Sequence, residues 1–202
     1  MTQAIFLNIS ETLIAGIMSF IGTNIDDIFI NMIFFAEADS ESKVKSVIAG
    51  KYLGMGALVL VSLLGAYCLH SVPDKFAGFL GLIPIALGLK EWISYKRRKE
   101  RAASEQPSIT DMSGSLILNV ILVTVSNGAD NIGVYVPLFA GYTAFQMILT
   151  ALIFAGMTAV WCFLGKKLSD LPAVRGILRK YRHVIVPAIL MGLGVYILVR
   201  NL

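Results

Sequence analysis

The chain has 202 residues, of which 56% are hydrophobic and 15% are charged, and its mean hydropathy is +0.76. Soluble domains carry about 25% charged residues to cover their surface, so this composition excludes an ordinary water-soluble protein. Six membrane spans of about 20 residues each would leave too few residues for a separate extramembranous domain. The same arithmetic excludes a nucleic-acid binder of the basic-patch kind, whereas the net charge of +4 says little until the charges are placed.

Long apolar stretches alternate with clusters of charge and predict membrane-spanning helices. Within a bilayer, a run of this length can form all its backbone hydrogen bonds only as a helix or in a closed barrel. Uninterrupted apolar runs favour the helix. Pro137 and Gly141 separate two spans within the longest uncharged stretch. We therefore expect an all-α integral membrane protein whose six spans cover residues 10–36, 46–70, 76–95, 114–140, 143–165 and 183–200.

The basic residues lie mainly on one side of this predicted topology. The side that holds loops 37–45, 96–113 and 166–182 carries 15 Lys and Arg residues, counting span ends, and the other side carries 2. The positive-inside rule places the basic side in the cytoplasm. Loops 96–113 and 166–182 are therefore expected to be cytoplasmic and both termini to lie outside.

The two halves of the chain resemble each other at an offset of 104 residues. Asp26-Asp27 aligns with Asp130-Asn131, and apolar positions late in each half also match. Three helices per repeat is an odd number, so the halves would cross the membrane in opposite directions, as in the inverted repeats of secondary transporters. The expected organisation is a first three-helix repeat over 1–95, a cytoplasmic linker over 96–113 and a second repeat over 114–202, in one membrane domain.

Acidic residues lie inside the first and fourth predicted spans. An ionised carboxylate at such a depth costs at least a few kcal/mol, so each must be protonated, paired or bound to a cation. We expect no Lys or Arg at a comparable depth, which leaves a cation from solution as the natural partner. The three carboxylates concerned are Asp26, Asp27 and Asp130.

Residues that favour helix interruption accompany these acids, which predicts that both spans are broken near the membrane midplane. An unwound segment frees backbone carbonyls, which join carboxylates and amides as oxygen ligands. The predicted ligands of a divalent cation are Asn24, Asp26, Asp27, Asn127, Asp130 and Asn131. The predicted supporting residues are Thr23, Asn31, Ser126 and Gly128. An alternative is that these polar residues cap the broken helices or hold the bundle together, and for Asn31 both readings stay open.

Position in the chain disfavours other ligands. His70 and His183 are expected at opposite faces of the membrane, and so are Cys68 and Cys162. A core site built on histidine or thiolate is therefore not expected.

A short six-span chain that carries Gly-Thr-Asn-Ile-Asp-Asp-Ile over 22–28 and an Asp130-Asn131 motif in its fourth span resembles the bacterial cadmium-resistance transporter family, within the LysE-type exporter superfamily. The resemblance covers essentially the whole chain. It implies export of a divalent metal, typically Cd²⁺, across the plasma membrane. It also implies that Asp26, Asp27, Asp130 and the neighbouring Asn residues are the metal and proton sites. An all-oxygen site by itself would favour harder ions such as Mn²⁺, Ca²⁺ or Mg²⁺.

The sequence has no phosphate-binding loop for a nucleotide, so transport would use an ion gradient. Carboxylates that bind either metal or protons would give proton-coupled antiport, with Asp26, Asp27 and Asp130 as the proton carriers. We expect no enzymatic activity, no cofactor besides the transported metal, no nucleic-acid partner and the lipid bilayer as surroundings. A homodimer is compatible with the sequence. Export of an organic cation or amino acid, an ion channel and an intramembrane aspartyl hydrolase using Asp26 and Asp130 remain alternatives.

Overall fold

The computed structural model describes residues 2–25, 27–69, 82–87, 89, 92–93, 115–169, 188–189 and 191–199. Within these residues the regular structure is entirely helical. The helices are α1 (Thr2–Asn24), α2 (Asp27–Glu37), α3 (Glu41–Leu69), α6 (Leu116–Ser126), α7 (Ala129–Ala140) and α8 (Ala144–Ser169). Residues 82–87 and 191–199, from the predicted third and sixth spans, are also helical.

Four of the predicted spans can be compared with these helices. α3 and α8 are each long and apolar enough to cross a membrane unbroken. The first and fourth spans are each a bent pair: α1 meets α2 at 65°, and α6 meets α7 at 64°. The predicted interruption of both spans is thus confirmed. The linker 96–113, more than half of the third span and part of the sixth span lie outside the described residues, so the six-span inverted repeat stays a prediction.

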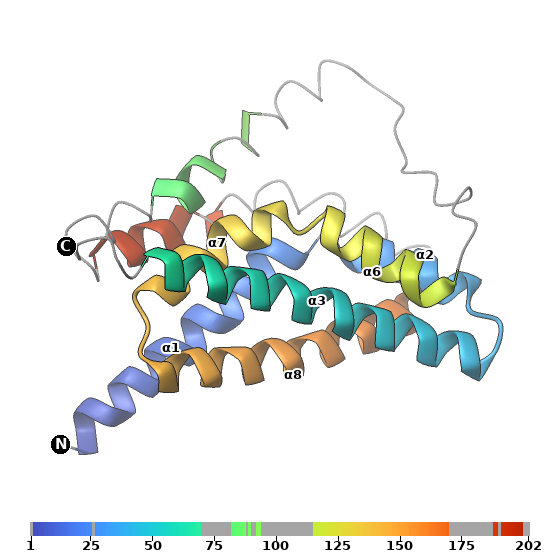
Figure 1. Ribbon diagram of the computed structural model, residues 1–202, viewed down its shortest axis with the longest axis horizontal. Helices are drawn as coiled ribbons and strands as arrows, with labels where there is room; N and C mark the ends of the chain where they lie inside the picture. The colour runs from blue at the N-terminus through green and yellow to red at the C-terminus, as the bar shows by residue number, and fades with distance from the viewer. Residues whose placement is uncertain are drawn as a thin grey trace.

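The helices of the two halves pack on each other. α3 packs against both α6 and α7, and α8 packs against both α1 and α2. Figure 1 shows that α1, α2 and α8 run in one direction, whereas α3, α6 and α7 run in the other. Each unbroken helix therefore lies on the broken span of the other half, an exchange that a two-fold relation between the halves would produce.

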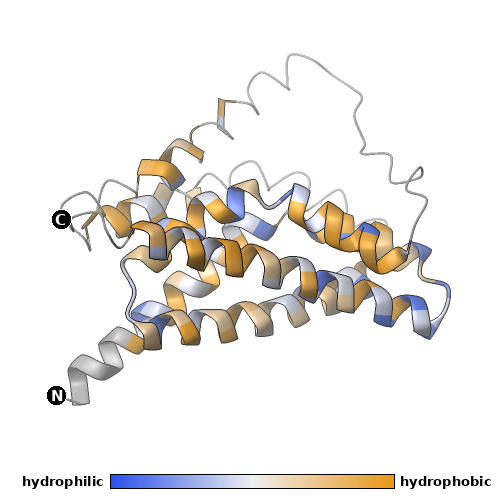
Figure 2. Ribbon diagram, in the orientation of Figure 1, coloured by the Kyte–Doolittle hydropathy of each residue, from blue (hydrophilic) through white to orange (hydrophobic). Residues whose placement is uncertain are grey.

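Apolar side chains cover the outside of this bundle. Figure 2 shows apolar residues along α3 and α8, with hydrophilic residues at the end where α3 begins. A soluble protein would not leave so much apolar surface exposed, but a lipid bilayer accepts it. The exposed apolar side chains of the two long helices include Leu53, Leu60, Leu64, Phe145, Ile148, Leu152 and Phe163.

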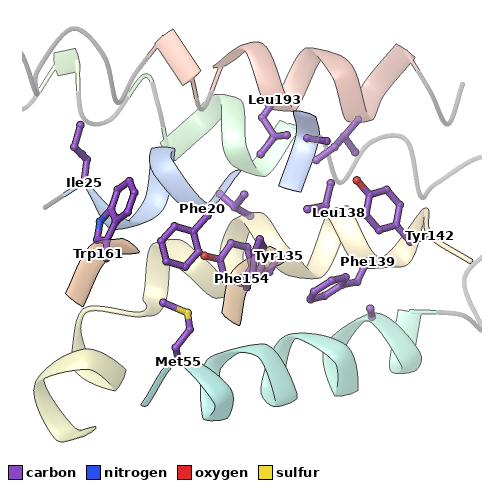
Figure 3. Packing of buried hydrophobic residues seen from close by; sticks show 14 of the residues in the cluster. Phe20, Ile25, Met55, Tyr135, Leu138, Phe139, Tyr142, Phe154, Trp161 and Leu193 are labelled. Carbon is purple, nitrogen blue, oxygen red and sulfur yellow. The ribbon is translucent and has the colours of Figure 1, made fainter. Parts of the chain in front are cut away.

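Aromatic side chains from three spans fill the core beside the helix breaks (Figure 3). The ring of Phe20 lies 5.7 Å from that of Phe154 and 5.3 Å from that of Trp161, between centroids. Tyr135 of α7 stacks on Phe154 with its centroid 4.4 Å away. These contacts fix α1, α7 and α8 around the two breaks.

Two glycines of α3 let α6 approach closely. A Cβ atom on Gly50 would lie 2.8 Å from Cβ of Val120, and one on Gly54 would lie 2.8 Å from Cβ of Thr124. These two small residues therefore lie at a helix contact within the chain, as small residues do between membrane helices.

Candidate metal site

The first break lies between Asn24 and Asp27. A helix that ends inside a bundle leaves backbone carbonyls without partners, and here the indole Nε1–H of Trp161 donates to the carbonyl of Asn24 at 2.7 Å. The side chain of Thr23 bonds back to the carbonyl of Ser19 at 2.9 Å. The end of α1 is therefore held by a side chain of α8. Asp26, a predicted ligand, lies outside the described residues.

The second break is a tight turn at Asn127 and Gly128. The backbone N–H of Asn127 donates to the carbonyl of Val123 at 3.1 Å, and the backbone N–H of Gly128 donates to the carbonyl of Val125 at 3.0 Å. A Cβ atom on Gly128 would clash with the side chain of Leu58 on α3. Gly128 thus permits the close approach of this break to α3.

A buried polar network connects the two breaks. The hydroxyl of Tyr135 lies 3.0 Å from Oγ1 of Thr23, 2.9 Å from Nδ2 of Asn24 and 3.2 Å from Nδ2 of Asn131. The amide of Asn131 also donates to Oδ1 of Asn24 at 3.1 Å. The structure therefore brings together Thr23, Asn24 and Asn131, and adds Tyr135 at their centre. Tyr135 lies four residues after Asn131, on the same helix face, which is the signal that could have identified it.

Asp27 forms a buried ion pair with Lys51 of α3. The ammonium Nζ lies 2.6 Å from Oδ2 of Asp27, and the exposed fractions of the two side chains are 3% for Lys51 and 9% for Asp27. Lys51 also donates to Oγ1 of Thr124 at 3.3 Å. Nδ2 of Asn127 lies 3.5 Å from the other oxygen of Asp27, so residues of both halves surround this carboxylate.

The expectation that no Lys or Arg lies at the depth of the acids is therefore wrong. Lys51 had been counted with the cytoplasmic charges because it is near the start of the predicted second span. α3 begins earlier than that span, at Glu41, and the long side chain of Lys51 reaches Asp27 within the bundle. A single lysine between two packing glycines, Gly50 and Gly54, was the available signal.

The other predicted site residues are less enclosed. Asp130 is half-buried at the start of α7, whereas Ser126 and Asn127 are exposed. Among the described residues, the side chain of Asp130 has no hydrogen bond or ion pair. No three His, Cys, Asp or Glu side chains in this part of the chain lie close enough together to hold a metal ion. The assignment of the six ligands therefore stays a prediction.

Asn31 is fully buried one turn after Asp27. Its exposed fraction is 1%, and neither Oδ1 nor Nδ2 has a hydrogen-bond partner within the described part of the chain. Its backbone lies against α8, since a Cβ atom on Gly165 would lie 2.7 Å from Cβ of Asn31. Cys162, one turn before Gly165, is buried with a free thiol. It belongs to a buried cluster with Phe34 and Phe35 of α2, Val47 of α3 and Val120 of α6.

Comparison with known proteins identifies the family. No curated protein and no solved structure matches the chain. A family model described as cadmium resistance transporter matches residues 20–202, which is most of the chain. The apolar helices of the chain agree with a multi-pass membrane protein. The chain belongs to the cadmium resistance transporter family.

Proposed function

We propose that the protein exports a divalent metal cation, preferentially Cd²⁺, from the cytoplasm in exchange for protons. The observation that carries this proposal is the buried pair of Asp27 and Lys51 at the first helix break. A carboxylate inside a membrane span is costly, and this one is balanced by a positive charge on a flexible side chain. Such a charge can give way to a cation from solution.

The ammonium of Lys51 and the metal would compete for the carboxylate of Asp27. A dication bound to Asp27 would repel an ammonium 2.6 Å from the same carboxylate, so the two do not occupy it together. The hydroxyl of Thr124, 3.3 Å from Nζ, offers the ammonium an acceptor on α6. The remaining proposed ligands are the carboxylates and amides of Asn24, Asp26, Asn127, Asp130 and Asn131.

The proposed cycle alternates access to this site from the two sides of the membrane. The positive-inside bias supports a bacterial plasma membrane orientation with both termini outside and loops 96–113 and 166–182 in the cytoplasm. Metal would bind from the cytoplasm while the carboxylates are ionised. Protons from outside would then neutralise Asp26, Asp27 and Asp130, release the metal and return with the neutral acids.

Two features support a rocking motion of the halves. The breaks give each half a bent span, and the hydroxyl of Tyr135 and the amide of Asn131 bond to residues of the other half. Hydrogen bonds between the halves can be broken and remade with other partners as the halves move. This network is the proposed contact that changes between the inward-open and outward-open states.

Purified protein in liposomes tests the proposal. Addition of Cd²⁺ should drive proton movement, reported by a pH-sensitive dye, and Asp26→Asn and Asp130→Asn should each abolish it. Asp39→Asn is the matched control, because Asp39 is an exposed acid in the connection between α2 and α3. Full proton movement in both site variants would refute the site. A binding titration should compare Cd²⁺, Zn²⁺, Mn²⁺ and an organic amine. If only the amine binds, the proposal that the substrate is a metal is refuted.

A further inference from the structure

We propose that Cys162 and Asn31 complete the metal site next to Asp27, so that the cation is held by one sulfur and two kinds of oxygen ligand. This inference rests on the proposed function and deepens it, because it explains how the site would select a soft divalent ion. The three residues come from α2 and α8, which pack directly on each other.

Asn31 supplies the first argument. A buried polar group without a partner costs about 1–3 kcal/mol, and Asn31 leaves both its amide oxygen and its amide nitrogen in that state at 1% exposure. It follows Asp27 by four residues, so the two side chains lie on the same face of α2. The amide of Asn31 is on the same helix face as the carboxylate of Asp27 and is free to bind the transported cation. Its Oδ1 is the oxygen that would coordinate the cation.

The packing of α2 on α8 directs Asn31 towards Cys162. A Cβ atom on Gly165 would lie 2.7 Å from Cβ of Asn31, so Asn31 projects from the side of α2 that faces α8. Cys162 precedes Gly165 by three residues and therefore shares its helix face. Its exposed fraction is 4%, and its sulfur is not in a disulfide.

Packing places this thiol one helical turn from the buried ion pair. Cys162 belongs to the same buried cluster as Val47 of α3 and Val120 of α6. These two residues precede Lys51 and Thr124 by four positions, and Lys51 bonds to Thr124 and pairs with Asp27 at 2.6 Å. A cation that replaces the ammonium would therefore bind the carboxylate within reach of the sulfur.

The chemistry of the three donors fits a soft divalent ion. Cys sulfur selects soft metals, whereas carboxylate and carbonyl oxygens suit Mg²⁺, Ca²⁺ and Mn²⁺. An all-oxygen site would not prefer Cd²⁺, but one thiolate changes that order. The thiol proton is released as the metal–sulfur bond forms. The two oxygen ligands keep the site weaker than an all-thiolate site, which a transporter needs for release.

The experiment measures metal binding by the full chain in detergent. The Cys68→Ser variant leaves Cys162 as the sole thiol, since the chain has two cysteines and Cys68 is exposed on α3. On addition of Cd²⁺ this variant should show the ultraviolet charge-transfer absorption of a cadmium–thiolate bond. Because this readout retains Cys162, it remains decisive if variants at position 162 fail to fold.

Replacement of the ligands gives the second readout. Cys162→Ser should lower the affinity for Cd²⁺ by about tenfold or more, and that for Mn²⁺ by no more than about twofold, because only the soft ion depends on sulfur. Asn31→Leu should weaken both ions, whereas Cys68→Ser should weaken neither.

Absence of the charge-transfer band in Cys68→Ser, or a wild-type Cd²⁺ affinity in folded Cys162→Ser, would overturn the inference. If Asp27→Asn still abolished metal binding in that case, the proposed function would stand without its sulfur ligand. A wild-type protein that binds no divalent cation would overturn both.

Discussion

Replacing Asp27 by Asn should destabilise the protein strongly, because it leaves the Lys51 ammonium buried without an anion. The two charged atoms are 2.6 Å apart, and at an effective dielectric constant of about 20 their attraction is about 6 kcal/mol. Desolvation of both groups offsets much of this attraction. Removing one partner of a buried pair nevertheless costs about 3–5 kcal/mol, whereas replacing both by uncharged residues is often neutral.

A double-mutant cycle separates these terms. Asp27→Asn and Lys51→Met should each lower the free energy of unfolding by about 3–5 kcal/mol. The double variant should lie within about 2 kcal/mol of wild type, so that the coupling energy is at least about 4 kcal/mol. Equilibrium unfolding in mixed detergent micelles measures the free energy of unfolding of the wild type, the two single variants and the double variant. Additive single effects would refute the claim that the two side chains form a buried pair.

The exposed pair of Asp39 and Lys43 is the matched control. Its atoms are 2.8 Å apart, but the side chains are 73% and 49% exposed, so solvent screening should leave little coupling. The hydrogen bond and the charge of Lys43 hold the pKa of Asp39 below its usual value of 3.8. Whatever this pair contributes should be fully present above that value and should be lost as the pH falls through the lower pKa of the folded state.

Two further substitutions test how the first break is held. Trp161→Phe removes the donor to the carbonyl of Asn24 and should lower the free energy of unfolding by about 1–3 kcal/mol; unchanged stability would mean that this hydrogen bond does not hold the end of α1. Gly165→Ala should cost about 1–3 kcal/mol by overpacking, because its Cβ would lie 2.7 Å from Cβ of Asn31. Gly156→Ala, with no neighbouring atom within 4 Å, should be tolerated, and equal effects at the two glycines would contradict the packing of α2 on α8.

The interruptions of the spans could be predicted from sequence because they depend on local residues. Asn and Gly next to an acid within an apolar run make a continuous helix unfavourable, and both spans bend where those residues occur. Asn24 and Asn131 also come together as the repeat suggested. That juxtaposition needed only the equivalence of the two segments, which the offset of 104 residues supplies.

The partners of these residues could not be predicted in the same way. Lys51, Tyr135 and Trp161 each contact the first break from another helix, so their roles depend on helix rotation and depth. Long amphipathic side chains can also place their polar ends several ångströms from their Cα atoms. A residue near a span end was therefore assigned to the surface, whereas packing of α3 against α6 places its ammonium in the interior.

Metal flux under an imposed pH gradient tests the central claim most directly. Liposomes that contain the purified protein and an acidic lumen should accumulate Cd²⁺ against its gradient. Accumulation should saturate with Cd²⁺, should cease when a protonophore collapses the pH difference, and should be absent with the Asp27→Asn Lys51→Met double variant, whose stability should stay near that of wild type. Accumulation that is unaffected by the protonophore, or equal in wild type and the folded double variant, would contradict proton-coupled export through this site.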